Sequence, residues 1–199
     1  MTTTIDGSTG IVTQAIDVTT PITVSDGGTG LSAAGSAGNV LVSDGTSWSS
    51  ASKLTYGTLV NTTSGTTADF TGIPSWAKRV NIILNEVAVS GSDTIVMVLG
   101  TASSLEITGY ISTFTSTVTY YASTTSFEIS QPQVALSGII TLDNISGNTW
   151  IASGAGKSGT SRMFVGGGSK TLASALTRLQ IKMSGANTFT AGSINIFYE

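Results

Sequence analysis

The sequence contains no cysteine and no histidine, and only 10% of its 199 residues carry a charged side chain. Without these two residue types, catalysis by a thiolate or an imidazole is excluded, and a zinc site would need carboxylates alone. The eight basic and eleven acidic residues give a net charge of −3, which provides no basic surface for duplex nucleic acid. We therefore expect no catalytic residue, no cofactor and no nucleic-acid partner.

Long apolar runs are missing as well. The apolar runs are short, such as residues 82–84 and 95–99, whereas a membrane-spanning helix needs about 20 apolar residues. Residues 1–7 have neither the basic start nor the apolar run of a secretory signal peptide. The absence of cysteine fits a reducing compartment. These features predict a chain without a signal peptide, which folds in a cytoplasm and does not insert into a membrane.

Serine, threonine and glycine take the place of the missing residue types. Serine and threonine make up close to a third of the chain, and there are 24 glycines. Residues 1–52 contain no lysine or arginine and few large side chains, and their Asp-Gly pairs at 26–27 and 44–45 are typical of tight turns. So few apolar side chains cannot form a core. We expect this segment to pack on other copies of the chain or on a partner; a flexible linker is the alternative.

From residue 53 onward, apolar and polar residues alternate in several segments. The clearest are residues 177–183 and 193–198, and residues 105–107 and 126–129 follow the same period of two. Such alternation indicates strands that have one buried face and one solvated face. The sequence therefore predicts a β-sheet domain after a stalk of about 50 residues, with the boundary near residue 53.

Two further segments, residues 80–89 and 95–99, are apolar on both faces, as expected for central strands of a packed pair of sheets. One short helix or strand is expected at residues 170–176. Glycines recur at a spacing typical of breaks between the strands of a sandwich, at positions 91, 100, 109, 138, 147, 154–159, 166–168, 185 and 192. We predict an all-β fold: an antiparallel, jelly-roll-like β-sandwich head at 53–199 and an extended, turn-rich stalk at 1–52.

Three features invite a chemical interpretation, and each has a simpler one. Residues 153–160 contain the Gly-Lys-Ser of a phosphate-binding loop, but the spacing needs glycine where Ile151 stands, and no helical sequence follows. A flexible hairpin loop explains them better. Residues 143–148 offer too few carboxylates for calcium and are typical of a turn, so we expect no metal site. The acidic residues of the head are not neighbours at strand spacing, which disfavours hydrolysis by paired carboxylates.

Four aromatic residues are candidates for binding a sugar, namely Tyr110, Tyr120, Tyr121 and Trp150. A large flat ring packs well on the C–H face of a pyranose. For each of the four, the alternative is packing in the core or between subunits. Tyr120 and Tyr121 are adjacent, so on a strand they face opposite sides, and we expect one of them to be exposed.

Three stretches resemble bacteriophage tail fibre proteins. The first combines residues 27–31 with residues 37–48, a sequence pattern typical of fibre stalks just before the distal head. The second, Phe-Thr-Gly-Ile-Pro-Ser-Trp-Ala-Lys-Arg-Val at residues 70–80, is similar to the opening of the fibre's C-terminal domain. The third, residues 189–199, resembles its end. Together the three stretches span most of the chain.

This resemblance implies a homotrimeric virion component of the tail, made in the host cytoplasm. It implies that the N-terminal region attaches to tail or baseplate proteins and that the head binds a host-surface polysaccharide or lipopolysaccharide for adsorption. It supplies no catalytic residues. A closed threefold ring also lets a segment without its own core share one among three chains. A polysaccharide-degrading tailspike and a non-receptor decoration protein of the virion are the alternatives.

Overall fold

The structure is a computed structural model that describes residues 22–116, 119–130 and 135–199. The chain divides into two compact units, residues 1–53 and residues 54–199. Both are built from antiparallel strands, with one short 3₁₀ helix, η1 (Val24–Asp26), among the described residues. The predicted all-β, antiparallel fold is therefore confirmed, and the jelly-roll detail stays a prediction.

The N-terminal unit contains a β-hairpin formed by β1 (Asn39–Ser43) and β2 (Trp48–Ser52). The Asp-Gly pair at residues 44–45, predicted to form a tight turn, lies in the connection between these two strands. One carboxylate oxygen of Asp44 accepts hydrogen bonds from the backbone N–H groups of Thr46 and Ser47, at 2.8 and 2.7 Å. Gly45 takes a φ of +92°, which glycine adopts without the steric cost that a side chain would bring. These bonds from Thr46 and Ser47 also lower the pKa of the Asp44 carboxyl.

This hairpin exposes its large apolar side chains on both faces. Val40, Leu41 and Val42 are consecutive on β1, so they alternate between the two faces of the hairpin, and all three are exposed. Trp48 at the start of β2 is exposed as well. An isolated hairpin of two strands is marginally stable at best in water. Within a single chain, the described part of this unit therefore has no core.

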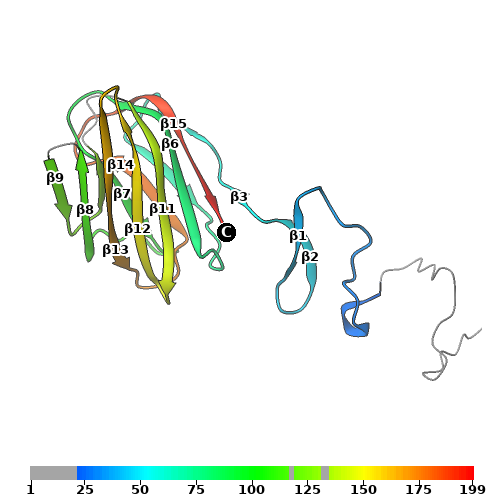
Figure 1. The fold of residues 1–199 in the computed structure, drawn as a ribbon. Helices are drawn as coiled ribbons and strands as arrows, with labels where there is room; N and C mark the ends of the chain where they lie inside the picture. The colour runs from blue at the N-terminus through cyan, green and yellow to red at the C-terminus, as the bar shows by residue number, and fades with distance from the viewer. Residues whose placement is uncertain (1–21, 117–118, 131–134) are drawn as a thin grey trace, which may run out of the picture. The chain divides into compact units, whose positions relative to one another are not determined.

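The C-terminal unit contains two sheets that share one apolar core (Figure 1). The large sheet has the strand order β3-β15-β6-β11-β12-β13-β8-β9, with β4 paired to β15, and the small sheet has the order β10-β7-β14-β5. The strands of the large sheet are β3 (Thr55–Tyr56), β4 (Val60–Asn61), β6 (Arg79–Val89), β8 (Tyr110–Ser116), β9 (Thr119–Ser123), β11 (Leu136–Ser146), β12 (Thr149–Ser158), β13 (Arg162–Thr171) and β15 (Phe189–Tyr198). Those of the small sheet are β5 (Thr67–Thr71), β7 (Ile95–Gly100), β10 (Phe127–Ser130) and β14 (Arg178–Met183).

Alternation in the sequence correctly identifies the buried faces of several strands. Leu179, Ile181 and Met183 of β14 are buried, while the residues between them are partly exposed. All residues of β7 are buried, as predicted for a central strand, and β7 lies between β10 and β14. The expectation of a helix or strand at 170–176 is wrong for most of that segment, because β13 ends at Thr171 and a non-helical connection follows.

The predicted strand at 105–107 is also wrong. Beyond the bridge between Gly100 and Leu105, this segment is a loop, and Ile107 is exposed. The loop is held over β7 by the backbone N–H of Glu106, which donates to the carbonyl of Leu99 at 2.9 Å. Tyr110 adds a second tie, because its hydroxyl donates to the carbonyl of Glu106 at 2.9 Å.

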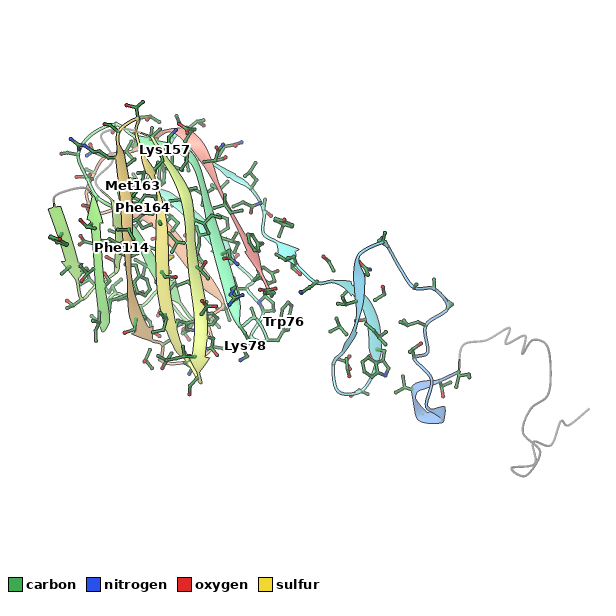
Figure 2. All side chains as sticks on the ribbon, viewed as in Figure 1. Trp76, Lys78, Phe114, Lys157, Met163 and Phe164 are labelled. Carbon is green, nitrogen blue, oxygen red and sulfur yellow. The ribbon has the colours of Figure 1, made fainter. Side chains whose placement is uncertain are left out.

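Several glycines predicted to break strands lie within them instead. Gly138 belongs to β11, Gly154 and Gly156 to β12, and residues 166–168 to β13, so the flexible loop expected at 153–160 is mostly strand. At Gly156 and Gly166 the reason is the space that an aromatic ring occupies. A Cβ on Gly156 would lie 2.7 Å from the Cα of Gly138 and closer still to the ring of Phe164, which is labelled on β13 in Figure 2. These two glycines make room on the core face for the ring of a neighbouring strand, whereas a Cβ on Gly154, Gly167 or Gly168 would meet other groups.

A methyl group at position 156 is expected to destabilise the C-terminal unit. We expect Gly156→Ala to lower the free energy of unfolding by about 1–3 kcal/mol, the usual cost of overpacking a dense core. Urea denaturation measures it. Because the Phe164 ring is one of the groups in the way, Gly156→Ala is expected to cost less in a Phe164→Leu background. Equal costs in both backgrounds would contradict this account of the glycine.

Candidate functional site

Two of the four aromatic residues predicted to bind sugar are core residues. Tyr110 is 1% exposed and Trp150 is 3% exposed, so neither ring offers a face to a surface glycan, and the prediction is corrected for both. The hydroxyl of Tyr110 accepts a hydrogen bond from the Leu99 N–H at 2.8 Å, and its ring packs edge-on against Phe127, with ring centroids 5.0 Å apart. Burial raises the pKa of the Tyr110 hydroxyl well above its ordinary value. Tyr110 thus joins the two sheets.

Trp150 lies on β12, on the core face of the large sheet. Its indole Nε1 is buried and has no hydrogen-bond partner among the residues that the structure describes. The side chain forms part of the wall of a cavity of about 180 Å³, together with Lys78, Asn148 and Leu176. Trp150 therefore closes one end of the core instead of presenting its ring to solvent.

Of the two adjacent tyrosines of β9, the structure describes the side chain of Tyr120 but not that of Tyr121. Tyr120 is 78% exposed and lies opposite Thr115 of β8. Tyr121 pairs with Phe114 through its backbone, and its side chain lies outside the part of the chain that is described. Tyr120 is thus the member of the predicted set that the structure shows to be accessible.

Tyr120 ends a row of residues that crosses the outer face of the large sheet. The strand registers place Ile83, Ile139, Ala155, Val165, Thr115 and Tyr120 side by side, on β6, β11, β12, β13, β8 and β9 in that order. We call these residues the outer row. Ile139 and Val165 are each 49% exposed, and Met163, next to the row on β13, is 70% exposed (Figure 2).

The outer row is unusual for an antiparallel sheet, whose solvated face normally carries polar side chains. Single exposed apolar residues are common, but a contiguous apolar surface with a polar rim is typical of an interface. Here the row continues over several neighbouring strands, and serine, threonine and glycine occupy the adjacent row at Thr141, Ser153, Gly167 and Thr113. The outer row is therefore an exposed, partly apolar surface that spans six strands of the large sheet.

Charged groups on this face are already neutralised by one another. Lys157 forms an ion pair with Glu86 at 2.7 Å, and Arg79 pairs with Asp143 at 2.6 Å and with Glu199 at 3.1 Å. Hydrogen bonds from Lys157 and Ser137 lower the pKa of the Glu86 carboxyl. As exposed pairs they add little stability. These two cations and three carboxylates leave one net negative charge, so the face has no strong excess of either charge to repel another copy of the chain.

A cleft of about 350 Å³ lies at one edge of the C-terminal unit, lined by Tyr56, Tyr198 and Asp69 among others. Tyr56 packs on Phe197 with centroids 5.6 Å apart. The Asp69 carboxylate is engaged, because Gln180 and Thr67 donate to its two oxygens at 2.6 and 2.9 Å. The cleft is therefore aromatic in character, and its carboxylate already has internal partners.

Sequence reasoning missed the outer row because the row exists only through strand register. Its residues come from six strands, and no two of them are closer than five positions in the chain. One signal was available: Met163, Phe164 and Val165 are three consecutive apolar residues on a strand, so at least one of them must face outward.

The remaining structural findings concern metals, membranes and known proteins. Across the described ranges, no three histidine, cysteine, aspartate or glutamate residues gather where they could hold a metal ion. No helix within those ranges has the length and apolar character needed to span a membrane. Comparison with protein-family models, curated proteins and solved structures finds no match to this chain.

Proposed function

We propose that the protein is a short, homotrimeric bacteriophage tail fibre that attaches the virion to its host. Residues 1–52 form the stalk and attach to tail or baseplate proteins, and residues 53–199 form the head, which binds a host-surface polysaccharide or lipopolysaccharide without cleaving it. One observation carries this proposal: the hairpin β1–β2 exposes Val40, Leu41, Val42 and Trp48, and has no core of its own.

A trimer gives these exposed side chains a place to pack. Burying apolar surface contributes about 25 cal/mol per Å², so three copies that bring their hairpins together stabilise a segment that one copy cannot. Because Val40 and Leu41 face opposite sides of the hairpin, each chain has an apolar surface for both of its neighbours in a closed ring. The resemblance of residues 37–48 to fibre stalks agrees with this arrangement.

In the C-terminal unit, we assign the subunit contact to the outer row. Its apolar side chains and its internally paired charges suit contact with another copy of the chain better than contact with a strongly charged partner. Tyr120 belongs to this row, so we place it at the subunit contact, and the glycan is bound elsewhere on the head. Tyr120→Ala should then weaken trimer formation and leave glycan binding by intact trimers unchanged.

Attachment needs no turnover. A head that binds one glycan weakly gains effective affinity of about 10²–10⁴ when several heads are linked, through local concentration alone. The ion pairs of Glu86, Glu106, Asp143 and Glu199 support binding over hydrolysis, because each of these carboxylates is paired with a cation.

Incubation of the purified protein with host cells and with their isolated surface polysaccharide tests this function. We expect the protein to sediment with the cells and to release no reducing ends. Release of reducing ends would favour the tailspike. Absence of binding, with antibody label on the capsid instead of the tail in electron micrographs, would favour the decoration protein.

A further inference from the structure

The small sheet carries a pocket on its outer face, away from the outer row. Val96 and Val98 of β7 form its apolar floor but are only 4% and 1% exposed, whereas Ile107, which also lines the pocket, is 59% exposed. The pocket has a volume of about 260 Å³. Sites for drug-sized ligands have about 300–1,000 Å³, so this pocket suits one small ring and not an oligosaccharide.

Glu128 of β10 lines this pocket and is exceptional among the carboxylates of the C-terminal unit. Six of its seven carboxylates have an ion pair or a hydrogen bond, and they belong to Asp69, Glu86, Asp93, Glu106, Asp143 and Glu199. Among the described residues Glu128 has no such partner, and burial raises the pKa of its carboxyl. A partly buried carboxylate without partners loses hydration and gains nothing within the chain, so an external donor would stabilise it.

Lys182 of β14 lies on the other side of the same floor. The registers pair Glu128 with Val96 and Val96 with Lys182, so the two charged residues are two strands apart, about 10 Å between Cα atoms. They form no ion pair within the described part of the chain, and Ser184 adds a hydroxyl at the pocket wall. A carboxylate, an ammonium and a hydroxyl thus surround an apolar floor, with a gap between the opposite charges.

We propose that this pocket binds a single pyranose ring of the host-surface glycan, an assignment that rests on the adhesive function proposed above. The C–H face of the sugar packs on Ile107, the exposed apolar side chain of the lining. One sugar hydroxyl donates to the Glu128 carboxylate, and a second hydroxyl or a sugar carboxylate accepts from the Lys182 ammonium. The edge cleft is less suitable for this role, because its carboxylate, Asp69, is already satisfied by Gln180 and Thr67.

The test compares binding of the isolated host polysaccharide by the wild-type trimer and by the variants Glu128→Gln and Lys182→Gln. Glu128→Gln keeps the shape of the side chain, Lys182→Gln gives a shorter one, and both remove the charge. We expect each to weaken binding by about 10- to 100-fold, as for loss of one hydrogen bond to a charged group. Asp69→Asn is the matched control, since its carboxylate is already engaged by Gln180 and Thr67 and lines the edge cleft instead of this pocket. It should leave binding within about twofold of wild type.

A second measurement does not depend on the variants. Methyl NMR signals of Ile107 are followed while methyl glycosides of the monosaccharides of that polysaccharide are added to the wild-type trimer. We expect the Ile107 methyl signals to shift with one of these sugars. If the wild type binds the polysaccharide, but Ile107 does not shift and the two variants bind like Asp69→Asn, the pocket assignment is wrong and the adhesive function stands. If the wild type binds no host polysaccharide, both proposals fail.

Discussion

A glutamate in place of Val165 is expected to separate the trimer into single chains. Val165 lies in the middle of the outer row, on β13, between Ala155 and Thr115. At a subunit contact, the new carboxylate would be buried without a cation, because Lys157 and Arg79 on this face already have acidic partners. Burying an unpaired charge costs far more than an apolar contact contributes. Light scattering should show the mass fall from about 61 kDa toward the 20.2 kDa of one chain.

The loss of the trimer is also expected to reduce adsorption to host cells by about 10²–10⁴, because single heads lose the gain from linkage. The matched control is Leu59→Glu, which places the same charge on another exposed apolar residue of this unit, outside the outer row. It should stay trimeric and bind cells normally. A trimeric Val165→Glu protein would exclude the outer row as the subunit contact.

Replacement of Lys170 by methionine is expected to cost the C-terminal unit about 3–5 kcal/mol of stability, the usual effect of removing one partner of a buried ion pair. Lys170 on β13 is 5% exposed, and its ammonium donates to Glu106 at 2.5 Å and to the carbonyl of Thr171 at 2.6 Å. It also lies 5.6 Å from the centre of the Tyr110 ring. Without the lysine, the partly buried Glu106 carboxylate keeps the N–H of Ala173 as its one donor among the described residues.

Denaturation at a fixed protein concentration measures this effect, since the stability of an oligomer depends on concentration. The double variant Lys170→Met with Glu106→Gln should recover part of the loss, because the uncompensated charge is gone and the amide oxygen still accepts from Ala173. A cost below about 1 kcal/mol for Lys170→Met would show that the pair behaves like an exposed one.

The same pair predicts how acid affects stability. Burial alone would raise the pKa of the Glu106 carboxyl, but hydrogen bonds from Lys170 and Ala173 outweigh it, and the pKa falls below its ordinary value of 4.5. A carboxyl whose pKa is lower in the folded state than in the unfolded state stabilises the fold at pH values above its unfolded-state pKa. This stabilisation is lost as the pH falls through its folded-state pKa. We expect the free energy of unfolding of Glu106→Gln to fall less steeply below pH 4.5 than that of the wild type. Parallel pH profiles of the two proteins would contradict this expectation.

The all-β fold and many of its buried faces follow from the sequence, because alternation with a period of two depends only on local order. That is why Leu179, Ile181 and Met183 were identified as core residues. The glycine-rich parts of β11, β12 and β13 were not predicted as strands, since glycine breaks strands in most settings. Gly156 and Gly166 belong to strands because the rings of Phe164 and Phe114 cover them, and these contacts depend on the neighbouring strand.

The candidate sites were harder to predict for the same reason. For Tyr110 and Trp150 the sequence left sugar binding and core packing both open, and the strand registers place them on the core face beside Lys170. The outer row brings together residues from six strands, and the pocket combines Glu128 with Lys182, which are more than fifty positions apart in the chain. Pairing between distant strands creates both surfaces, and composition and local patterns carry no information about that pairing.

The mass of the purified full-length protein in solution tests the shared-core account most directly. Three chains of 20.2 kDa predict about 61 kDa by light scattering, at every concentration above that at which the trimer dissociates. Hydrogen exchange on the same sample should show protected amides in β1 and β2. A single species of about 20 kDa whose β1 and β2 amides are nevertheless protected from exchange would contradict the account, because that hairpin would then be ordered without any neighbour.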